Sequence, residues 1–387
     1  MPVVLKGSRS QSAPLPAGNV LSGSTMAASC IGAGPAGGRT APVIEIGLLN
    51  NMPDAALQST ERQFVELISA AAGELTVRMR FVSLPAVPRG EAAASHLQAT
   101  YADIHELRNG ELDALIVTGA EPRAACLHQE PYWNSLSAII DWAEHNTIST
   151  IWSCLAAHAA VLHLDGVRRQ PLEEKRFGVF GCAPSAADPL VSGLTAPLRV
   201  PHARWNELKE SELIAHGYRV LTRSPDAGVD LFTKQWRSLF VFFQGHPEYD
   251  ADALLREYRR DIGRFLRGES EICPPIPRNY LDARSQRALE EFAAAGRERR
   301  HGEWLASFPE ELTLRPELAR YWRISAIPVM RNWLNLLAAR KAYRCRLGAA
   351  GAEFWCPAPQ GARPSSTRWG RHRLESRRLE WRRLGTY

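Results

Sequence analysis

The sequence predicts an α/β protein in which a mostly parallel sheet is flanked by helices, with further helices on its C-terminal side. Between residues 43 and 267, short apolar runs alternate with amphipathic segments of about ten to fifteen residues, a pattern typical of β-α-β units. The chain has 387 residues, of which 45% are hydrophobic, which is enough to bury a large core without disulfides. It contains no run of eighteen apolar residues, so no transmembrane helix is expected.

The first half of the segment from 43 to 267 predicts four strands and their connecting helices. The run Val43-Ile44-Glu45-Ile46-Gly47-Leu48-Leu49 predicts a buried strand, which a turn at 50–54 follows. The next helix has one apolar face at helical spacing, made of Leu57, Phe64, Leu67 and Ile68. We then expect strands at 75–84, 112–117 and 148–152, a helix at 131–145, and another helix that begins at Cys154.

The second half predicts shorter strands and then helices. Strands are expected at 176–182, 218–222, 231–234 and 239–243, some of them antiparallel. A helix at 251–267 is expected to cover the last of these strands. Two further helices are expected at 279–300, which is rich in charge, and at 328–344, which is apolar and basic.

Composition divides the chain into four parts. Residues 1–41 are rich in Gly, Ala, Ser and Pro, which predicts a disordered leader; Met26 within it is an alternative start. We assign 42–270 to the α/β domain, 271–345 to a C-terminal helical extension, and 346–387 to a disordered Arg-rich tail. Residues 361–387 hold eight arginines and two glutamates, so their net charge is +6. The net charge of the whole chain is also +6. A nucleic-acid-binding function would rest on this tail alone, since no recognition motif accompanies it.

The cysteines and histidines indicate a reducing compartment and no metal site. The seven cysteines are scattered, without a Cys-x-x-Cys pair, and the N-terminus has no continuous apolar segment of a secretory signal. We therefore expect a cytoplasmic protein. His158, His202 and His246 show no short ligand spacing, so no zinc is expected.

The strongest chemical signal lies at Cys154. An apolar strand, Ile151-Trp152-Ser153, runs directly into Cys154 and then into the small residues of a helix. A strand-to-helix elbow exposes its junction side chain at the carboxyl end of the sheet, and the helix N-terminus favours a thiolate there. The backbone N–H of Leu155 would stabilise an oxyanion. Taken alone, the segment is more typical of a buried core cysteine than of a nucleophile.

A second signal follows the apolar strand Leu239–Phe243. The sequence continues Gln244-Gly245-His246-Pro247-Glu248, which places a histidine just past the end of a buried strand and a carboxylate two residues later. The histidine is within reach of a thiol on a neighbouring strand, and the carboxylate holds the other ring nitrogen. Cys154, His246 and Glu248 together therefore predict a nucleophile, a base and its orienting acid.

A cysteine elbow followed by His-Pro-Glu resembles the class I glutamine amidotransferases. The elbow departs from theirs at three positions, where Trp152 and Ala156 replace glycines and His158 replaces a glutamine. The resemblance implies their fold, and a glutamine amidotransferase or related cysteine hydrolase remains an alternative function. A non-enzymatic binding protein on the same fold is a second alternative.

The homoserine O-succinyltransferase family is a closer match, from about Val43 to Asp261. The segments that resemble this family are 46–53 (Ile-Gly-Leu-Leu-Asn-Asn-Met-Pro), Thr60-Glu61, 115–120, Tyr132-Trp133, 174–180, 201–204 (Pro-His-Ala-Arg) and 245–251 with Glu257-Tyr258 and Arg260-Asp261. The resemblance implies a ping-pong O-acylation of L-homoserine by succinyl-CoA, or by acetyl-CoA, in methionine biosynthesis. It also implies a homodimer and no bound cofactor.

The same resemblance implies the role of each site residue. Cys154 would carry the acyl group, His246 would act as base and acid, and Glu248 would orient it. Arg260 would pair with the amino-acid carboxylate, and Lys175 and Arg204 would also bind substrate. The loop after Thr118-Gly119-Ala120 would select the acyl chain, and Arg123 in this loop would bind a succinyl carboxylate, which favours succinyl-CoA. Ala203 replaces the serine of the family.

Overall fold

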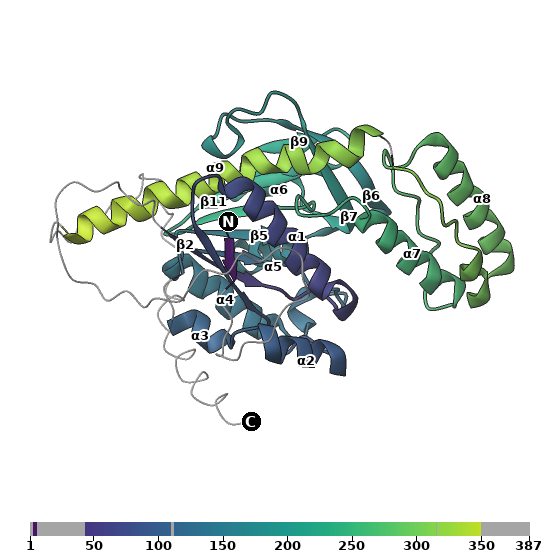
Figure 1. The fold of residues 1–387 in the computed structure, drawn as a ribbon, viewed down its shortest axis with the longest axis horizontal. Coiled ribbons are helices and arrows are strands. Elements are labelled where there is room, and N and C mark those ends of the chain that lie inside the picture. Colours follow the sequence, from purple (N-terminus) through teal and green to yellow (C-terminus); the bar gives the residue numbers. More distant parts are fainter. Residues whose placement is uncertain (1–2, 6–42, 110–111, 315, 350–387) are drawn as a thin grey trace, which may run out of the picture. The chain divides into compact units, whose positions relative to one another are not determined.

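The structure, a computed structural model, describes residues 3–5, 43–109, 112–314 and 316–349 (Figure 1). The account below concerns the compact unit that ends at Ala342, together with the rest of the last helix. Residues 1–2 and 6–41 of the predicted leader and residues 350–387 of the predicted tail lie outside the described part. Within the leader, β1 (Val3–Leu5) pairs in parallel with β3 (Val77–Val82) and forms one edge of the main sheet.

Eight of the described strands form the main sheet, in the order β1-β3-β2-β4-β5-β12-β11-β8. Its parallel strands are β2 (Ile44–Leu49), β3 (Val77–Val82), β4 (Ala114–Val117), β5 (Ser149–Ser153) and β12 (Leu239–Phe243). The antiparallel strands β11 (Leu231–Gln235) and β8 (Arg219–Val220) complete one edge. The predicted class and the expected mixture of strand directions are therefore confirmed.

Helices cover both faces of this sheet, because the apolar strands have side chains to bury on each side. On one face, α1 (Asp54–Ala72) and α9 (Pro316–Ala349) pack against Ile44, Ile46 and Val241, and Figure 1 shows α9 crossing the sheet next to α1. On the other face, α3 (Ile104–Asn109), α4 (Trp133–Asn146) and α5 (Leu155–Asp165) pack against Leu115, Trp152 and Phe242.

A second sheet stands at the carboxyl end of these strands, in the order β10-β9-β6-β7. Its strands are β6 (Gln170–Pro184), β7 (Leu198–Glu207), β9 (Thr222–Ser224) and β10 (Gly228–Val229). The predicted strand 218–222 is split between the two sheets, and β7 was not predicted as a strand. The remaining short elements are α2 (Glu91–Thr100), η1 (Leu127–Gln129), η2 (Pro189–Val191) and α6 (Glu210–Ala215).

The expected position of the helix at 251–267 is wrong. This helix, α7 (Ala253–Leu266), forms a third apolar cluster with Phe177 and Val179 of β6, with α8 (Ala283–Arg299) and with η3 (Gly302–Ser307). Strand β12 does not need it, because its alternate side chains are already buried in the two clusters on either face of the main sheet. The apolar stripe of α7 therefore packs against the second sheet.

The last helix begins twelve residues before the predicted start at Pro328. Proline is common at the first position of a helix, but in α9 it lies inside the helix, where its missing N–H removes one hydrogen bond. Burial of Val329, Met330 and Trp333 on the sheet offsets this loss. Trp333 Nε1 donates a 2.9 Å hydrogen bond to Ser149 Oγ, and Lys341 Nζ lies 2.7 Å from an Asp113 carboxylate oxygen.

No helix among the described residues is long and apolar enough to cross a membrane.

Candidate active site

Cys154 occupies a strained turn between β5 and α5. Its φ of 52° and ψ of −113° lie in a region that non-glycine residues rarely adopt and that is common at nucleophile elbows. Its backbone N–H donates a 2.8 Å hydrogen bond to Phe243 O. A Cβ on Gly119 would lie 2.7 Å from Leu155 Cβ and 3.1 Å from Leu155 N. Only glycine therefore lets the loop after β4 approach the elbow this closely.

His246 lies level with Cys154 because β5 and β12 are in register. Ser153 pairs with Phe243 at the ends of the two parallel strands, so the segments that follow them leave the sheet side by side. The turn places His246 Nδ1 2.9 Å from Glu248 Oε1. The imidazole stacks on the ring of Tyr249, with 4.1 Å between ring centroids. Both His246 and Glu248 are buried.

The site favours the charged form of His246. Burial lowers the pKa of the imidazole, but the negative charges of Cys154 and Glu248, and the hydrogen bonds that the ring donates to both residues, outweigh burial and raise the pKa well above 6.5. A histidine that is protonated next to a cysteine stabilises the thiolate, which is the nucleophilic form of the cysteine. This arrangement fits covalent catalysis through sulfur.

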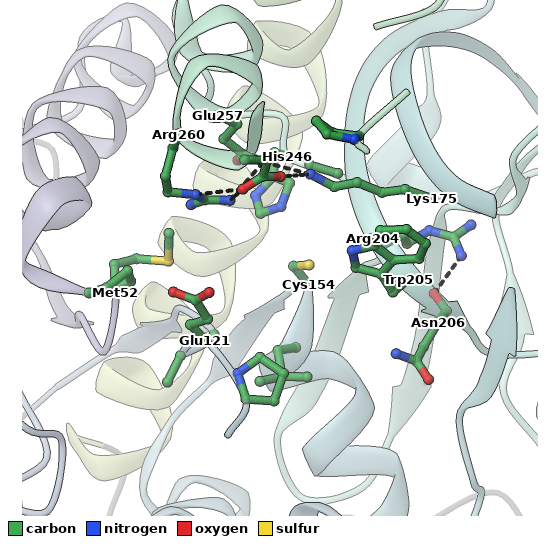
Figure 2. A pocket seen from close by; sticks show the side chains of 18 of the residues that line it. Met52, Glu121, Cys154, Lys175, Arg204, Trp205, Asn206, His246, Glu257 and Arg260 are labelled. Carbon is green, nitrogen blue, oxygen red and sulfur yellow. Dashed lines mark hydrogen bonds and ion pairs between the residues drawn. The ribbon is translucent and has the colours of Figure 1, made fainter. Parts of the chain in front are cut away.

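One cavity of about 590 Å³ contains most of the predicted site residues (Figure 2). It opens above the carboxyl ends of the central strands, where open α/β sheets place their ligands. The predicted residues that line it are Cys154, Leu155, Lys175, Arg204, His246 and Arg260. Glu248 does not line it and supports His246 from behind.

Lys175 and Arg260 meet at one end of this cavity around a shared acid. Lys175 Nζ lies 2.7 Å from Asp261 Oδ2 and 3.6 Å from Glu257 Oε2. Arg260 contacts the other Asp261 oxygen at 2.7 Å, and Figure 2 shows Lys175, Glu257 and Arg260 together at this end of the cavity. Burial raises the pKa of Asp261, but Lys175 and Arg260 outweigh it and hold the pKa below its usual value. The end of the cavity therefore presents both charge signs, which suits a zwitterionic amino acid.

Arg204 lines the cavity, but most of its hydrogen-bond donors point into the protein. Its Nη1 donates to Asn206 O at 2.7 Å, its Nη2 donates to Ala227 O, and its Nε lies 3.4 Å from His202 Nδ1. The side chain is buried. These contacts give Arg204 a role in holding β7 next to the loop at Ala227, and substrate binding by it stays a prediction.

Arg123 lies apart from the other predicted residues. It lines a neighbouring cavity of about 260 Å³ and its side chain is exposed. Glu121, which forms an ion pair with Arg264, is one of the residues that line both cavities. The acyl-selecting role of Arg123 therefore stays a prediction about a site beside the main cavity.

Two groups near Cys154 escaped sequence reasoning. Glu257 and Asp261 were noted as parts of a motif but not as partners of Lys175. His158, on the first turns of α5, is not predicted as a site residue from the sequence, and its Nε2 lies 3.1 Å from Gln244 Oε1. The spacing of Glu257 and Asp261, four residues apart on one helix with Arg260 between them, was the available signal.

Within the described residues, no group of three or more His, Cys, Asp or Glu side chains is arranged to hold a metal ion.

Comparison with known proteins identifies what the chain resembles. A family model described as homoserine O-succinyltransferase matches residues 14–343. Among curated proteins called homoserine O-succinyltransferase, one from Rhodopseudomonas palustris is 54% identical over 299 residues, covering 77% of this chain and 90% of that protein. One from Bradyrhizobium japonicum is 50% identical over 309 residues, covering 79% and 94%. A solved glutamine amido transferase from Methylobacillus flagellatus covers 76% of this chain and 94% of its own, with 14% identity and a TM-score of 0.44.

Proposed function

The chain belongs to the homoserine O-succinyltransferase family, and from this membership we propose that it transfers the acyl group of succinyl-CoA to the hydroxyl of L-homoserine in methionine biosynthesis. The observation that carries the mechanism is the cavity that holds Cys154, His246 and the Lys175–Arg260 pair together. Acetyl-CoA is the alternative donor.

In the first half-reaction, Cys154 takes the acyl group. The thiolate attacks the thioester carbonyl, and the backbone N–H of Leu155 at the start of α5 stabilises the resulting oxyanion. The C–S bond to coenzyme A breaks, and the leaving thiolate takes a proton from His246. The product is an acyl-cysteine, with Glu248 holding the imidazole in place through Nδ1.

In the second half-reaction, homoserine releases the acyl group. His246, now neutral, accepts the proton of the homoserine hydroxyl. The hydroxyl oxygen attacks the carbonyl carbon of the acyl-cysteine at the same time. The C–S bond to Cys154 breaks, which restores the thiolate and the protonated imidazole. Arg260 and Lys175 would bind the amino-acid carboxylate, and Glu257 would accept from its ammonium group, because these side chains meet at one end of the cavity.

The preference for succinyl-CoA rests on Arg123. Arg123 lines the neighbouring cavity, which shares the residues Pro53, Ala120, Glu121, Pro122 and Arg264 with the main cavity. A succinyl chain has a terminal carboxylate for which an arginine is a suitable partner, and an acetyl chain has none. We also keep a cytoplasmic homodimer as part of the proposal, on the family resemblance alone.

Intact-mass spectrometry tests the proposal. We expect an acyl adduct after exposure to succinyl-CoA, less adduct at equal times with acetyl-CoA, and loss of the adduct when L-homoserine is added. The peptide that contains Cys154 should carry it, and the Cys154→Ala variant should stay unmodified.

Two results would contradict the proposal. One is a folded protein that forms no adduct with either donor. The other is release of ammonia from glutamine in a Cys154-dependent reaction, which would favour the amidotransferase alternative.

A further inference from the structure

We propose that Asp230 and His202 form a buried pair that positions the turn carrying His246, and that this pair thereby sets the rate of acyl transfer without touching substrate. The inference rests on the proposed function of His246. Asp230 lies between β10 and β11, His202 lies on β7, and both have 0% exposed surface. A buried carboxylate is stable only when its oxygens are hydrogen-bonded, so its partners indicate what it holds.

Both carboxylate oxygens of Asp230 bind the strand ends around the site. Oδ1 accepts a 3.0 Å hydrogen bond from the backbone N–H of Gly245, the residue before His246. Oδ2 lies 3.5 Å from Thr222 Oγ1. Because Thr222 Oγ1 already accepts from Leu231 N at 3.1 Å, its own proton is free to donate to the carboxylate. Asp230 therefore ties the His246 turn to β9 and β11.

His202 lies between the same carboxylate and Arg204 of the cavity wall. Arg204 Nε can only donate, so His202 Nδ1, 3.4 Å away, is the acceptor. The ring proton is then on Nε2, which lies 3.5 Å from Asp230 Oδ1 but forms no hydrogen bond with it. The residue before it, Pro201, accepts a 2.8 Å hydrogen bond from the backbone N–H of His246. The turn is thus held by β7 and by Asp230 at two successive amides.

The space around the turn leaves no room for another position. A Cβ on Gly245 would lie 2.5 Å from Val200 Cγ1, 2.9 Å from Asp230 Oδ1 and 2.9 Å from Pro201 O. The glycine is therefore pressed against both β7 and the carboxylate. Loss of the carboxylate would leave the Gly245 amide buried without an acceptor and a gap under the turn.

The pair also adds negative charge beneath the base. Burial raises the pKa of Asp230 to about 6, although the Gly245 N–H, Arg204, Thr222 and His246 all favour its ionised form. Burial lowers the pKa of His202 well below 6.5, as do Arg204 and His246, so its ring is neutral. His246 itself faces Cys154 and Glu248 from its other sides. At neutral pH an ionised Asp230 therefore supports the imidazolium form of His246.

Two substitutions at Asp230 separate position from charge. Asp230→Ala removes the acceptor for Gly245, and we expect kcat for succinyl transfer to fall by roughly 30- to 100-fold, the scale of a small misplacement of a catalytic group, with KM changed less than about threefold. Asp230→Asn keeps an acceptor oxygen for Gly245 and should recover kcat to within about fivefold of wild type. In Asp230→Asn the pH profile of the rate of Cys154 alkylation by iodoacetamide should shift to higher pH, because a less stable imidazolium stabilises the thiolate less.

Asp113 supplies a matched control. It is also a buried aspartate that accepts a backbone N–H, from Glu45 at 2.8 Å, but it precedes β4 and so lies at the opposite end of the strands from Cys154. Asp113→Ala should lower the thermal midpoint while kcat and the alkylation profile stay at wild-type values.

The inference is overturned if Asp230→Ala lowers the thermal midpoint as Asp113→Ala does but leaves kcat and the alkylation profile unchanged. Failure of the proposed function is a separate result. If wild-type protein forms no acyl adduct, the alkylation profile of Cys154 still reports whether Asp230 acts on His246.

Discussion

At the scale of single residues, the ionisation of the site is set by neighbours of His246. Glu248 contacts the imidazole directly, at 2.9 Å, and it raises the pKa of His246 together with Cys154 against the opposing effect of burial. The charges of Cys154 and Glu248 therefore both favour the imidazolium form of His246. Their state is measurable without any substrate, through the reactivity of the thiol.

We expect Glu248→Gln to weaken this ion pair. The amide keeps a hydrogen bond to Nδ1 but carries no charge, so the pKa of His246 falls and less of Cys154 is thiolate at neutral pH. Iodoacetamide should alkylate Cys154 at least about tenfold more slowly at pH 6.5, since a one-unit pKa change is a factor of ten, with wild-type reactivity recovered at high pH.

The control is a second histidine–glutamate pair, in which His96 Nε2 lies 2.9 Å from Glu61 Oε1. Glu61→Gln should leave the alkylation profile unchanged. Equal profiles for Glu248→Gln and wild type would contradict the assigned role of Glu248.

Strand ends made Cys154 and His246 predictable from the sequence, because residues just past buried parallel strands meet at one edge of a sheet. Asp230 was not predictable in this way. It stands at the start of the apolar strand 231–235, and its partners Thr222, His202 and Gly245 come from three other segments. Only the register of the folded strands brings them together.

At the scale of elements, α9 completes one face of the main sheet. Trp333 is 1% exposed and its indole N–H donates to Ser149 on β5, the strand that leads to Cys154. The helix was predicted from its apolar pattern, but its first twelve residues were not, because Pro328 is also typical of a helix start. Tertiary burial, which outweighs the local cost of the proline, cannot be read from sequence spacing.

We expect Trp333→Ala to destabilise the protein by about 3–5 kcal/mol, the usual cost of removing a large buried aromatic side chain. Urea unfolding followed by circular dichroism measures this change. Ile324→Ala on the same helix, where the side chain is 56% exposed, should change the free energy of unfolding by less than about 0.5 kcal/mol. Similar values for the two variants would show that α9 does not anchor the sheet.

At the scale of the whole molecule, stability should fall in mild acid because of buried neutral histidines. Burial, with Arg204 and Arg169, lowers the pKa of His158 to about 3, whereas an unfolded histidine has its ordinary value of 6.5. Between these values the unfolded chain binds a proton that the folded chain does not. Stability contributed by this residue is therefore complete above pH 6.5 and is lost as the pH falls toward 3.

The His158→Gln variant tests this dependence. A glutamine keeps a group that can donate to Gln244 but does not titrate, so the variant should lose less stability than wild type between pH 6.5 and 4, by up to about 1.4 kcal/mol per pH unit. Thermal midpoints across this range measure the difference. His145→Gln, at an exposed position, should lose stability as wild type does. The explanation would be contradicted if His158→Gln lost as much stability as wild type over this pH range.

The position of α9 has a consequence for the newly made chain. The sheet face that Trp333 covers includes Ile44 and Ile46, which leave the ribosome almost three hundred residues earlier. At about 5–20 residues per second, translation of the intervening chain takes on the order of 15–60 s. During that interval an apolar sheet face has no cover from its last helix. We therefore expect recruitment of chaperones to nascent chains, and aggregation of fragments that stop before residue 324, to be features of the biosynthesis of this protein.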